Sequence, residues 1–173
     1  MIHVFGDSFS IDNSNDSWVT QLTATSYATR GASEYRIWKT YQLNKHLIKP
    51  DDTILFCHTS PYRVFLKNNS TLLSRFLPSH TVCDIIINDI IAKKESKFIN
   101  VLNTIWDEDY FYDTYSLLVN DLKNIPNSFH FTFFESDLVH SFYKTWTTNP
   151  GTINHLTIKG NQEVYKDISK WLD

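Results

Sequence analysis

The sequence has few of the features that mark secreted, disulfide-bonded or membrane-spanning proteins. Only two of its 173 residues are cysteines, Cys57 and Cys83, and they do not form a CxxC pair. We therefore expect two buried, reduced thiols rather than a disulfide framework. The longest apolar runs, such as residues 84–92, are interrupted by Asn88 and Asp89. None of these runs approaches the roughly 20 residues that a membrane-spanning helix needs.

The chain also lacks an excess of positive charge and a leader-like N-terminus. Its net charge is −3 at pH 7, so nothing indicates a surface for nucleic acid. The first residues do not combine a basic stretch with a signal-type apolar core. We expect a cytoplasmic protein with no cofactor, no metal, and no nucleic-acid or membrane partner, while the oligomeric state stays open. A metal is not expected because these histidines match no ligand spacing such as HxxxH: His3, His46, His80, His130 and His140.

The composition and the order of segments favour a single α/β domain over residues 1–173. Hydrophobic residues make up 42% of the chain and aromatic residues 15%, which is typical of a globular protein with a proper core. Segments rich in β-branched and aromatic residues predict strands at 2–5, 26–29, 53–57 and 129–134. Helices are predicted at 16–22, 33–47, most of 84–125 and 156–172, with a long loop and some helix over 60–80. This alternation predicts a three-layer α/β/α sandwich around a parallel sheet of four to five strands.

A serine follows the first predicted strand directly. The segment 6–10 reads Gly-Asp-Ser-Phe-Ser, and Gly6 permits backbone angles that other residues resist. A side chain at this place stands at the edge of the sheet, where α/β proteins keep their chemistry. Ser8 is therefore a candidate nucleophile, although a plainer interpretation is that it caps the turn. Asp7 is expected to hold the same turn through bonds to backbone amides.

A histidine near the other end of the chain is the candidate base. His155 follows Asn154 and precedes the last predicted helix. An imidazole with an unperturbed pKa of about 6.5 can take the proton of a serine hydroxyl at neutral pH. The two groups can meet only if the fold brings the ends of the sequence together. The plainer alternative is that His155 merely adjoins a helix cap at Asn154.

Three short blocks of the sequence resemble the signature of the SGNH, or GDSL-type, hydrolase family. They read GDSFS at 6–10, RGAS at 30–33 and NHLTIKGN at 154–161, and they occur in the order of that family over most of the chain. The resemblance implies a flavodoxin-like SGNH hydrolase fold with Ser8 as the nucleophile and His155 as the base. It also implies an oxyanion hole that includes the amides of Ser8 and Gly31.

Two positions depart from the pattern of that family. Ser60 stands where the family has an oxyanion-binding asparagine, and its hydroxyl can donate over a shorter reach. Thr152 stands three residues before His155, where the family has an aspartate. A hydroxyl can orient an imidazole but does little to stabilise its positive charge. We therefore expect a Ser–His dyad or an atypical triad, with Thr152 or a backbone carbonyl as the orienting group.

The function that follows is hydrolysis of small acyl esters, with O-acetyl groups on carbohydrate as one candidate substrate. Two alternatives stay open: a catalytically weakened member of the fold that binds a ligand, and an acyltransferase that uses the same serine. His58 and Arg63, near the end of the third predicted strand, are candidate substrate-binding residues. Their plainer interpretations are a satisfied buried histidine and a surface ion pair. A group of aromatic residues is expected to pack in the core, with sugar stacking as the alternative: Trp106, Tyr110, Phe111, Tyr112 and Tyr115.

Overall fold

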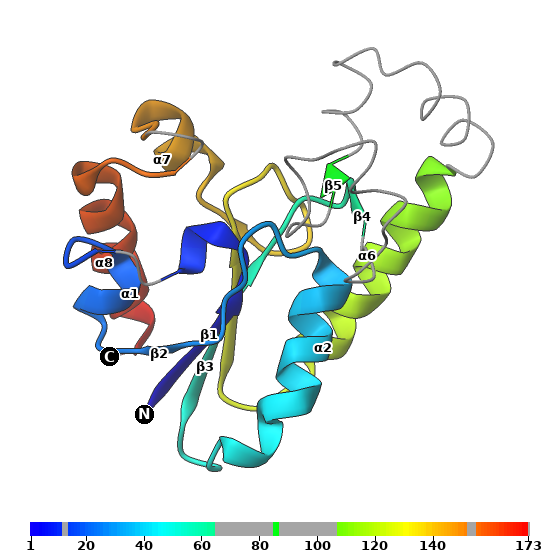
Figure 1. The fold of residues 1–173 in the computed structure, drawn as a ribbon, viewed down its shortest axis with the longest axis horizontal. Helices are drawn as coiled ribbons and strands as arrows, with labels where there is room; N and C mark the ends of the chain where they lie inside the picture. The colour runs from blue at the N-terminus through cyan, green and yellow to red at the C-terminus, as the bar shows by residue number, and fades with distance from the viewer. Residues whose placement is uncertain (12–13, 65–84, 87–106, 152–154, 173) are drawn as a thin grey trace, which may run out of the picture.

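The centre of the structure is a sheet of five parallel strands (Figure 1). The structure is a computed structural model that describes residues 1–11, 14–64, 85–86, 107–151 and 155–172. The strands lie in the order β2-β1-β3-β6-β7. A parallel α/β sheet is what the sequence predicts, and this expectation is confirmed. The bounds of the strands are β1 (Ile2–Gly6), β2 (Thr25–Ser26), β3 (Thr53–His58), β6 (Ser128–Thr132) and β7 (His140–Ser141).

The winding of the sheet reverses between β1 and β3. The chain places β2 on one side of β1 and then β3 on the other side. In open α/β sheets, ligands bind at the carboxyl ends of the strands where such a reversal occurs. Residues 7–10 follow β1 and residues 59–62 follow β3, so both segments lie at this edge.

Helices cover both faces of the sheet, as Figure 1 shows. One face carries α1 (Trp18–Gln21), α7 (Tyr143–Thr148) and α8 (Ile158–Leu172), and the other carries α2 (Glu34–Asn44) and α6 (Glu108–Lys123). The side chains of β3 alternate between the two layers. Leu55 and Cys57 pack in the first layer, and Ile54 and Phe56 in the second. Burial on both faces explains why this strand is an uninterrupted apolar run.

The last helix is tied to the turn that follows β1. Val164 and Ile168 of α8 are fully buried and lie one turn apart, so they anchor this helix on the sheet. The Asn161 side chain accepts a hydrogen bond from the backbone N–H of Trp18 at 3.2 Å. The Trp18 indole in turn donates to the carbonyl of Phe9 at 2.9 Å. The two ends of the sequence are therefore held together through α1.

Short elements account for the differences between the predicted and the observed structure. β2 spans Thr25–Ser26 rather than 26–29, and the sequence does not predict β7 or α7. A strand of two residues is too short to display the period of two that identifies strands. β5 (Ile85–Ile86) pairs antiparallel with β4 (Arg63–Val64), so the predicted helix over 84–125 is wrong at its start and confirmed at α6. Residues 65–84 and 87–106, on which the remaining loop and helix predictions fall, lie outside the described part.

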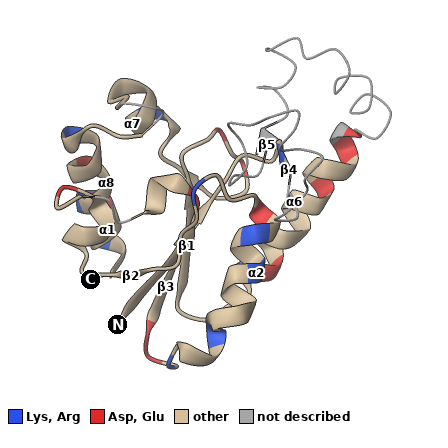
Figure 2. Cartoon of the chain, viewed as in Figure 1, with Lys and Arg blue, Asp and Glu red and all other residues tan. Residues whose placement is uncertain are grey.

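The distribution of thiols and charges adds little that distinguishes a function. Cys57 is free and buried, and burial raises the pKa of its thiol, while Cys83 lies outside the described residues. Acidic and basic residues are interspersed over the helices and loops in the view of Figure 2. None of the described helices is long and apolar enough to cross a membrane.

Candidate active site

Ser8 lies immediately beyond the carboxyl end of β1. It is the first residue of the short 3₁₀ helix η1 (Ser8–Ser10), and it is partly exposed to solvent. The side chain of Asp7 caps this helix by accepting a hydrogen bond from the amide of Phe9 at 3.0 Å. A Cβ on Gly6 would lie 2.5 Å from the hydroxyl oxygen of Ser10 and 2.8 Å from the Cβ of Cys57. Glycine at this position therefore lets the turn pack closely against β3.

Asp7 connects the turn after β1 to the residues that follow β3. Its carboxyl group is fully buried and accepts a second hydrogen bond, from the Thr59 hydroxyl at 3.2 Å. The same Thr59 oxygen accepts a hydrogen bond from Nε of Arg63 at 3.1 Å. Burial raises the pKa of Asp7, and the positive charge of Arg63, the two hydrogen bonds and the nearby His155 oppose this rise. Asp7 therefore holds the turn in place, as the sequence suggests.

His155 lies on the segment that leads into α8. Its carbonyl accepts a hydrogen bond from the amide of Gly151, and Pro150 forms an antiparallel bridge with Leu156. The imidazole stacks on the ring of Phe9 with 5.8 Å between the ring centroids and 24° between the planes. Since Phe9 is the residue after Ser8, this contact places the imidazole beside the turn that carries the serine.

Ser8 and His155 line one pocket of about 140 Å³, together with Phe9, Ile11, Ser14, Ser17, Leu156 and Asn161. The fold therefore brings the predicted nucleophile and the predicted base to the same place. Within the described residues, no hydrogen bond joins the Ser8 hydroxyl to the His155 ring. Catalytic hydrogen bonds are often long in structures without substrate and tighten when it binds. Thr152, the predicted orienting group of His155, lies outside the described residues.

Backbone amides that could bind an oxyanion are present at the same edge. The amides of Ser8 and Gly31 have no hydrogen-bond partner within the described part of the chain. Gly31 has a φ of 61°, the left-handed region that favours glycine. The amide of Thr29, just before Arg30 and Gly31, donates to the carbonyl of Gly6 at 3.1 Å, so the loop that carries Gly31 leaves the sheet beside the end of β1. Such free donors are what a developing oxyanion requires.

Ser60 is the predicted third donor, and it belongs to a tight turn after β3. Its hydroxyl oxygen accepts a hydrogen bond from the amide of Tyr62 at 3.3 Å, and its carbonyl accepts one from the amide of Arg63 at 3.1 Å. The hydroxyl oxygen accepts in this turn, which leaves its hydrogen available for another acceptor. The side chain is close to full burial, with 7% of the residue exposed.

His58 lies in a buried network rather than at the surface of a pocket. Nδ1 of its ring is 2.8 Å from Oε1 of Glu34, and Nε2 is 2.9 Å from Nδ1 of His130. Nε2 of His130 is 2.8 Å from the hydroxyl of Ser128, which itself donates to the carbonyl of Ile125 at 2.6 Å. Both ring nitrogens of His58 are thus occupied, and the residue is 1% exposed. This geometry is that of the satisfied buried histidine, the plainer of the two interpretations.

The protons of this network can be assigned from its ends. Burial and the neighbouring His58 and Lys123 lower the pKa of His130 to about 3, so its ring is neutral at neutral pH. Because Ser128 donates its own proton elsewhere, His130 donates through Nε2 and accepts through Nδ1. His58 must then donate through Nε2, and its Nδ1 lies 2.8 Å from Oε1 of Glu34. The second carboxylate oxygen of Glu34 accepts from the amide of Thr59 at 3.3 Å, which fixes the end of β3.

Sequence reasoning did not identify Thr59, Glu34 or His130 as parts of the site and its support. The one local signal concerns Thr59, because His58 and Thr59 are polar residues directly after a continuous apolar run. Within the described residues, no group of three or more His, Cys, Asp or Glu side chains could hold a metal ion. The fold and the site define an α/β protein that presents a serine and a histidine in one pocket at the winding reversal of its sheet. Comparisons with protein families, with curated proteins and with solved structures found no match to this chain.

Proposed function

We propose that this protein is a serine esterase of the SGNH type, which hydrolyses small acyl esters through an acyl-serine intermediate. The observation that carries the proposal is the shared pocket of Ser8 and His155, two residues from opposite ends of the sequence. The strand order β2-β1-β3-β6-β7 supports the proposal. If only these five strands are counted along the chain, the order is 2-1-3-4-5, which is that of flavodoxin-like sheets. The amides of Ser8 and Gly31, which have no partner among the described residues, supply the second requirement, a place for the negative charge of the intermediate.

The chemistry proceeds in two balanced steps. In the first, Oγ of Ser8 attacks the carbonyl carbon while His155 takes the hydroxyl proton, and the negative charge moves to the former carbonyl oxygen. The bond to the alcohol then breaks, and His155 gives the alcohol its proton. In the second step, water attacks the acyl-serine, His155 takes a proton from the water, and the Ser8–acyl bond breaks. The proton returns to Oγ of Ser8 as the acid leaves.

The oxyanion is bound by groups on three different segments. The amide of Ser8 follows β1, the amide of Gly31 lies in the loop before α2, and the hydroxyl of Ser60 follows β3. Loss of one such donor typically lowers kcat by about 10²–10³-fold. Asp7 and Thr59 act on these donors indirectly, because their hydrogen bond holds the loops after β1 and β3 at a fixed separation.

The proposal is tested by covalent labelling and by hydrolysis of an activated short-chain ester. We expect the purified protein to react with a fluorophosphonate probe and to hydrolyse p-nitrophenyl acetate. Ser8→Ala should abolish labelling, and both Ser8→Ala and His155→Ala should lower kcat by about 10³-fold or more. Ser169→Ala and His46→Ala are matched controls: Ser169 lies on α8 outside the pocket, and His46 is exposed on η2 (Lys45–Leu47).

Two results would contradict the esterase. Labelling or hydrolysis that persists unchanged in Ser8→Ala would show that the serine is not the nucleophile. A properly folded wild-type protein that neither reacts with the probe nor turns over the ester would favour a ligand-binding member of the fold. The lack of a hydrogen bond between the Ser8 hydroxyl and the His155 ring in the described structure supports this ligand-binding alternative. Product analysis with an added alcohol acceptor then distinguishes hydrolysis from acyl transfer.

A further inference from the structure

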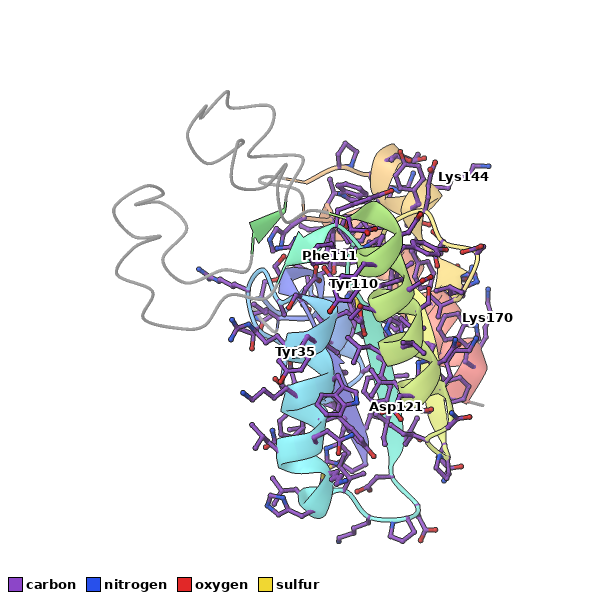
Figure 3. All side chains as sticks on the ribbon, turned by 90° about the vertical axis from the view of Figure 1, so that its right-hand side faces the viewer. Tyr35, Tyr110, Phe111, Asp121, Lys144 and Lys170 are labelled. Carbon is purple, nitrogen blue, oxygen red and sulfur yellow. The ribbon has the colours of Figure 1, made fainter. Side chains whose placement is uncertain are left out.

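A second pocket lies at the same edge of the sheet, between the first turns of α2 and α6. It encloses about 190 Å³, the volume of roughly six water molecules, which suits a single sugar-sized ring. Tyr35 of α2 and Tyr110 and Phe111 of α6 line this pocket, and Figure 3 labels them on these two helices. The remaining lining residues are Ser33, Glu34, Pro61, Arg63, Thr114, Tyr115 and Leu118.

Arg63 supplies the positive charge of this pocket. Its Nε donates to Thr59, and no described residue accepts a hydrogen bond from the two Nη groups. A guanidinium with two parallel free N–H groups is the side chain best suited to bind a carboxylate in a bidentate manner. The carboxylate of Glu34 does not compete for this role, because one of its oxygens bonds His58 and the other bonds the amide of Thr59.

The aromatic residues supply flat apolar surface around this charge. Tyr110 is 63% exposed and Tyr35 is 39% exposed, and the Tyr35 ring is held by stacking on Trp38 at 5.9 Å between the ring centroids. Tyr115, which is 5% exposed, adds a buried aromatic ring to the lining. Exposed aromatic faces of this kind stack against the C–H faces of sugar rings, since one side of each ring is apolar and its edges are polar.

We propose that this pocket binds a carboxylate-bearing sugar ring, with Arg63 paired to the carboxylate and Tyr35, Tyr110 and Phe111 covering the ring. The two pockets share no described lining residue, but a chain of hydrogen bonds links their walls: Arg63 bonds Thr59, and Thr59 bonds Asp7, the neighbour of Ser8. The inference deepens the proposed function by naming an acidic sugar as the alcohol part of the ester. That the bound sugar is part of an ester substrate depends on the proposed function, whereas the binding of the sugar does not need Ser8.

The test measures binding in the Ser8→Ala variant of the full chain, so that no turnover interferes. Methyl β-glucuronoside and methyl β-glucoside differ only in one substituent of the ring, a carboxylate in the first and a hydroxymethyl group in the second. Both are titrated at about 0.15 M salt, which screens the charges of the exposed Asp107 and Asp109 at the start of α6. We expect the glucuronoside to bind about tenfold more tightly, measured by ligand-observed NMR. Addition of Arg63→Met should remove this difference and leave the weaker glucoside binding unchanged.

Further variants separate the roles of charge and ring. Arg63→Lys keeps the positive charge and should retain part of the preference, even if Arg63→Met disturbs the loop. Tyr110→Ala should weaken both glycosides by a similar factor, and Lys170→Gln, on the far helix α8, should change neither. Equal affinity for the two glycosides, a preference that survives Arg63→Met, or no binding of either would overturn the proposal. If the glucuronoside binds but wild-type protein is not labelled by the fluorophosphonate, the esterase fails while the acidic-sugar pocket stands.

Discussion

The buried histidine pair makes a quantitative prediction about stability in acid. Folded His130 has a pKa of about 3, against an ordinary value of 6.5. The unfolded chain therefore binds a proton at this residue below pH 6.5, whereas the folded chain does so only near pH 3. Acid favours the form that binds more protons, so the stability that this residue contributes is present above pH 6.5 and is lost as the pH falls toward 3.

The size of this loss of stability follows from the width of the pH interval between the unfolded and the folded pKa of His130. Each pH unit inside it lowers the free energy of unfolding by about 1.4 kcal/mol, and the loss between pH 7 and pH 4.5 reaches up to about 2.5 kcal/mol. His130→Asn should remove this dependence. The asparagine oxygen can still accept the hydrogen bond from Nε2 of His58, but the side chain does not titrate. The variant loses the ring that stacks on Phe56 at 5.1 Å, so a lower stability at pH 7 is also expected.

Urea unfolding at several pH values between 7 and 4.5 provides the measurement. The informative quantity is the difference in slope between wild type and His130→Asn, because titrating groups outside the network of His130, His58 and Glu34 contribute equally to both. His46→Asn, which changes an exposed histidine, should keep the slope of the wild type. Parallel curves for wild type and His130→Asn would refute the assignment of a neutral, buried His130 and with it the proton assignment of the network.

Three further predictions concern the site and the core. Ser60→Ala should lower kcat for a short-chain ester by about 10²-fold with little change in KM, and an unchanged kcat would remove Ser60 from the oxyanion hole. Gly31→Ala should lower the free energy of unfolding by about 1–2 kcal/mol in urea, because a φ of 61° is strained for alanine; equal stability would argue against this backbone conformation. Ile168→Ala should cost about 2–5 kcal/mol in the same assay, since the side chain is fully buried, and a loss below 1 kcal/mol would mean that α8 does not pack as described.

The parts of the fold that the sequence predicts are those with a strong local pattern. The run that forms β3 is apolar without interruption, and it proves to be buried on both faces. The last helix shows a regular apolar stripe that includes Val164 and Ile168, and these residues prove to be fully buried. The turn at residues 6–10 combines a glycine with polar residues after a strand, and it does carry Ser8 at the edge of the sheet.

The parts that the sequence does not predict depend on contacts between distant residues. His58 finds Glu34 at a separation of 24 residues and His130 at a separation of 72. Nothing in the segment around His58 distinguishes a histidine that points into such a network from one that faces a ligand. Thr59 is similar, because its bond to Asp7 spans 52 residues and arises only from the alignment of β1 with β3. The pairing of Ser8 with His155 is predicted from their residue types and from the family resemblance, whereas the contact of His155 with Phe9 depends on the fold.

The position of His155, just before α8, has a consequence for the order of events during synthesis. The turn that bears Ser8 leaves the ribosome well before His155 and α8, the helix that is tied to α1. On the proposed mechanism, a nascent chain without His155 and α8 carries a hydroxyl with no base beside it, so Ser8 becomes reactive only after α8 has emerged and packed on the sheet. Ribosome-stalled chains of increasing length would reveal this as an abrupt onset of probe labelling.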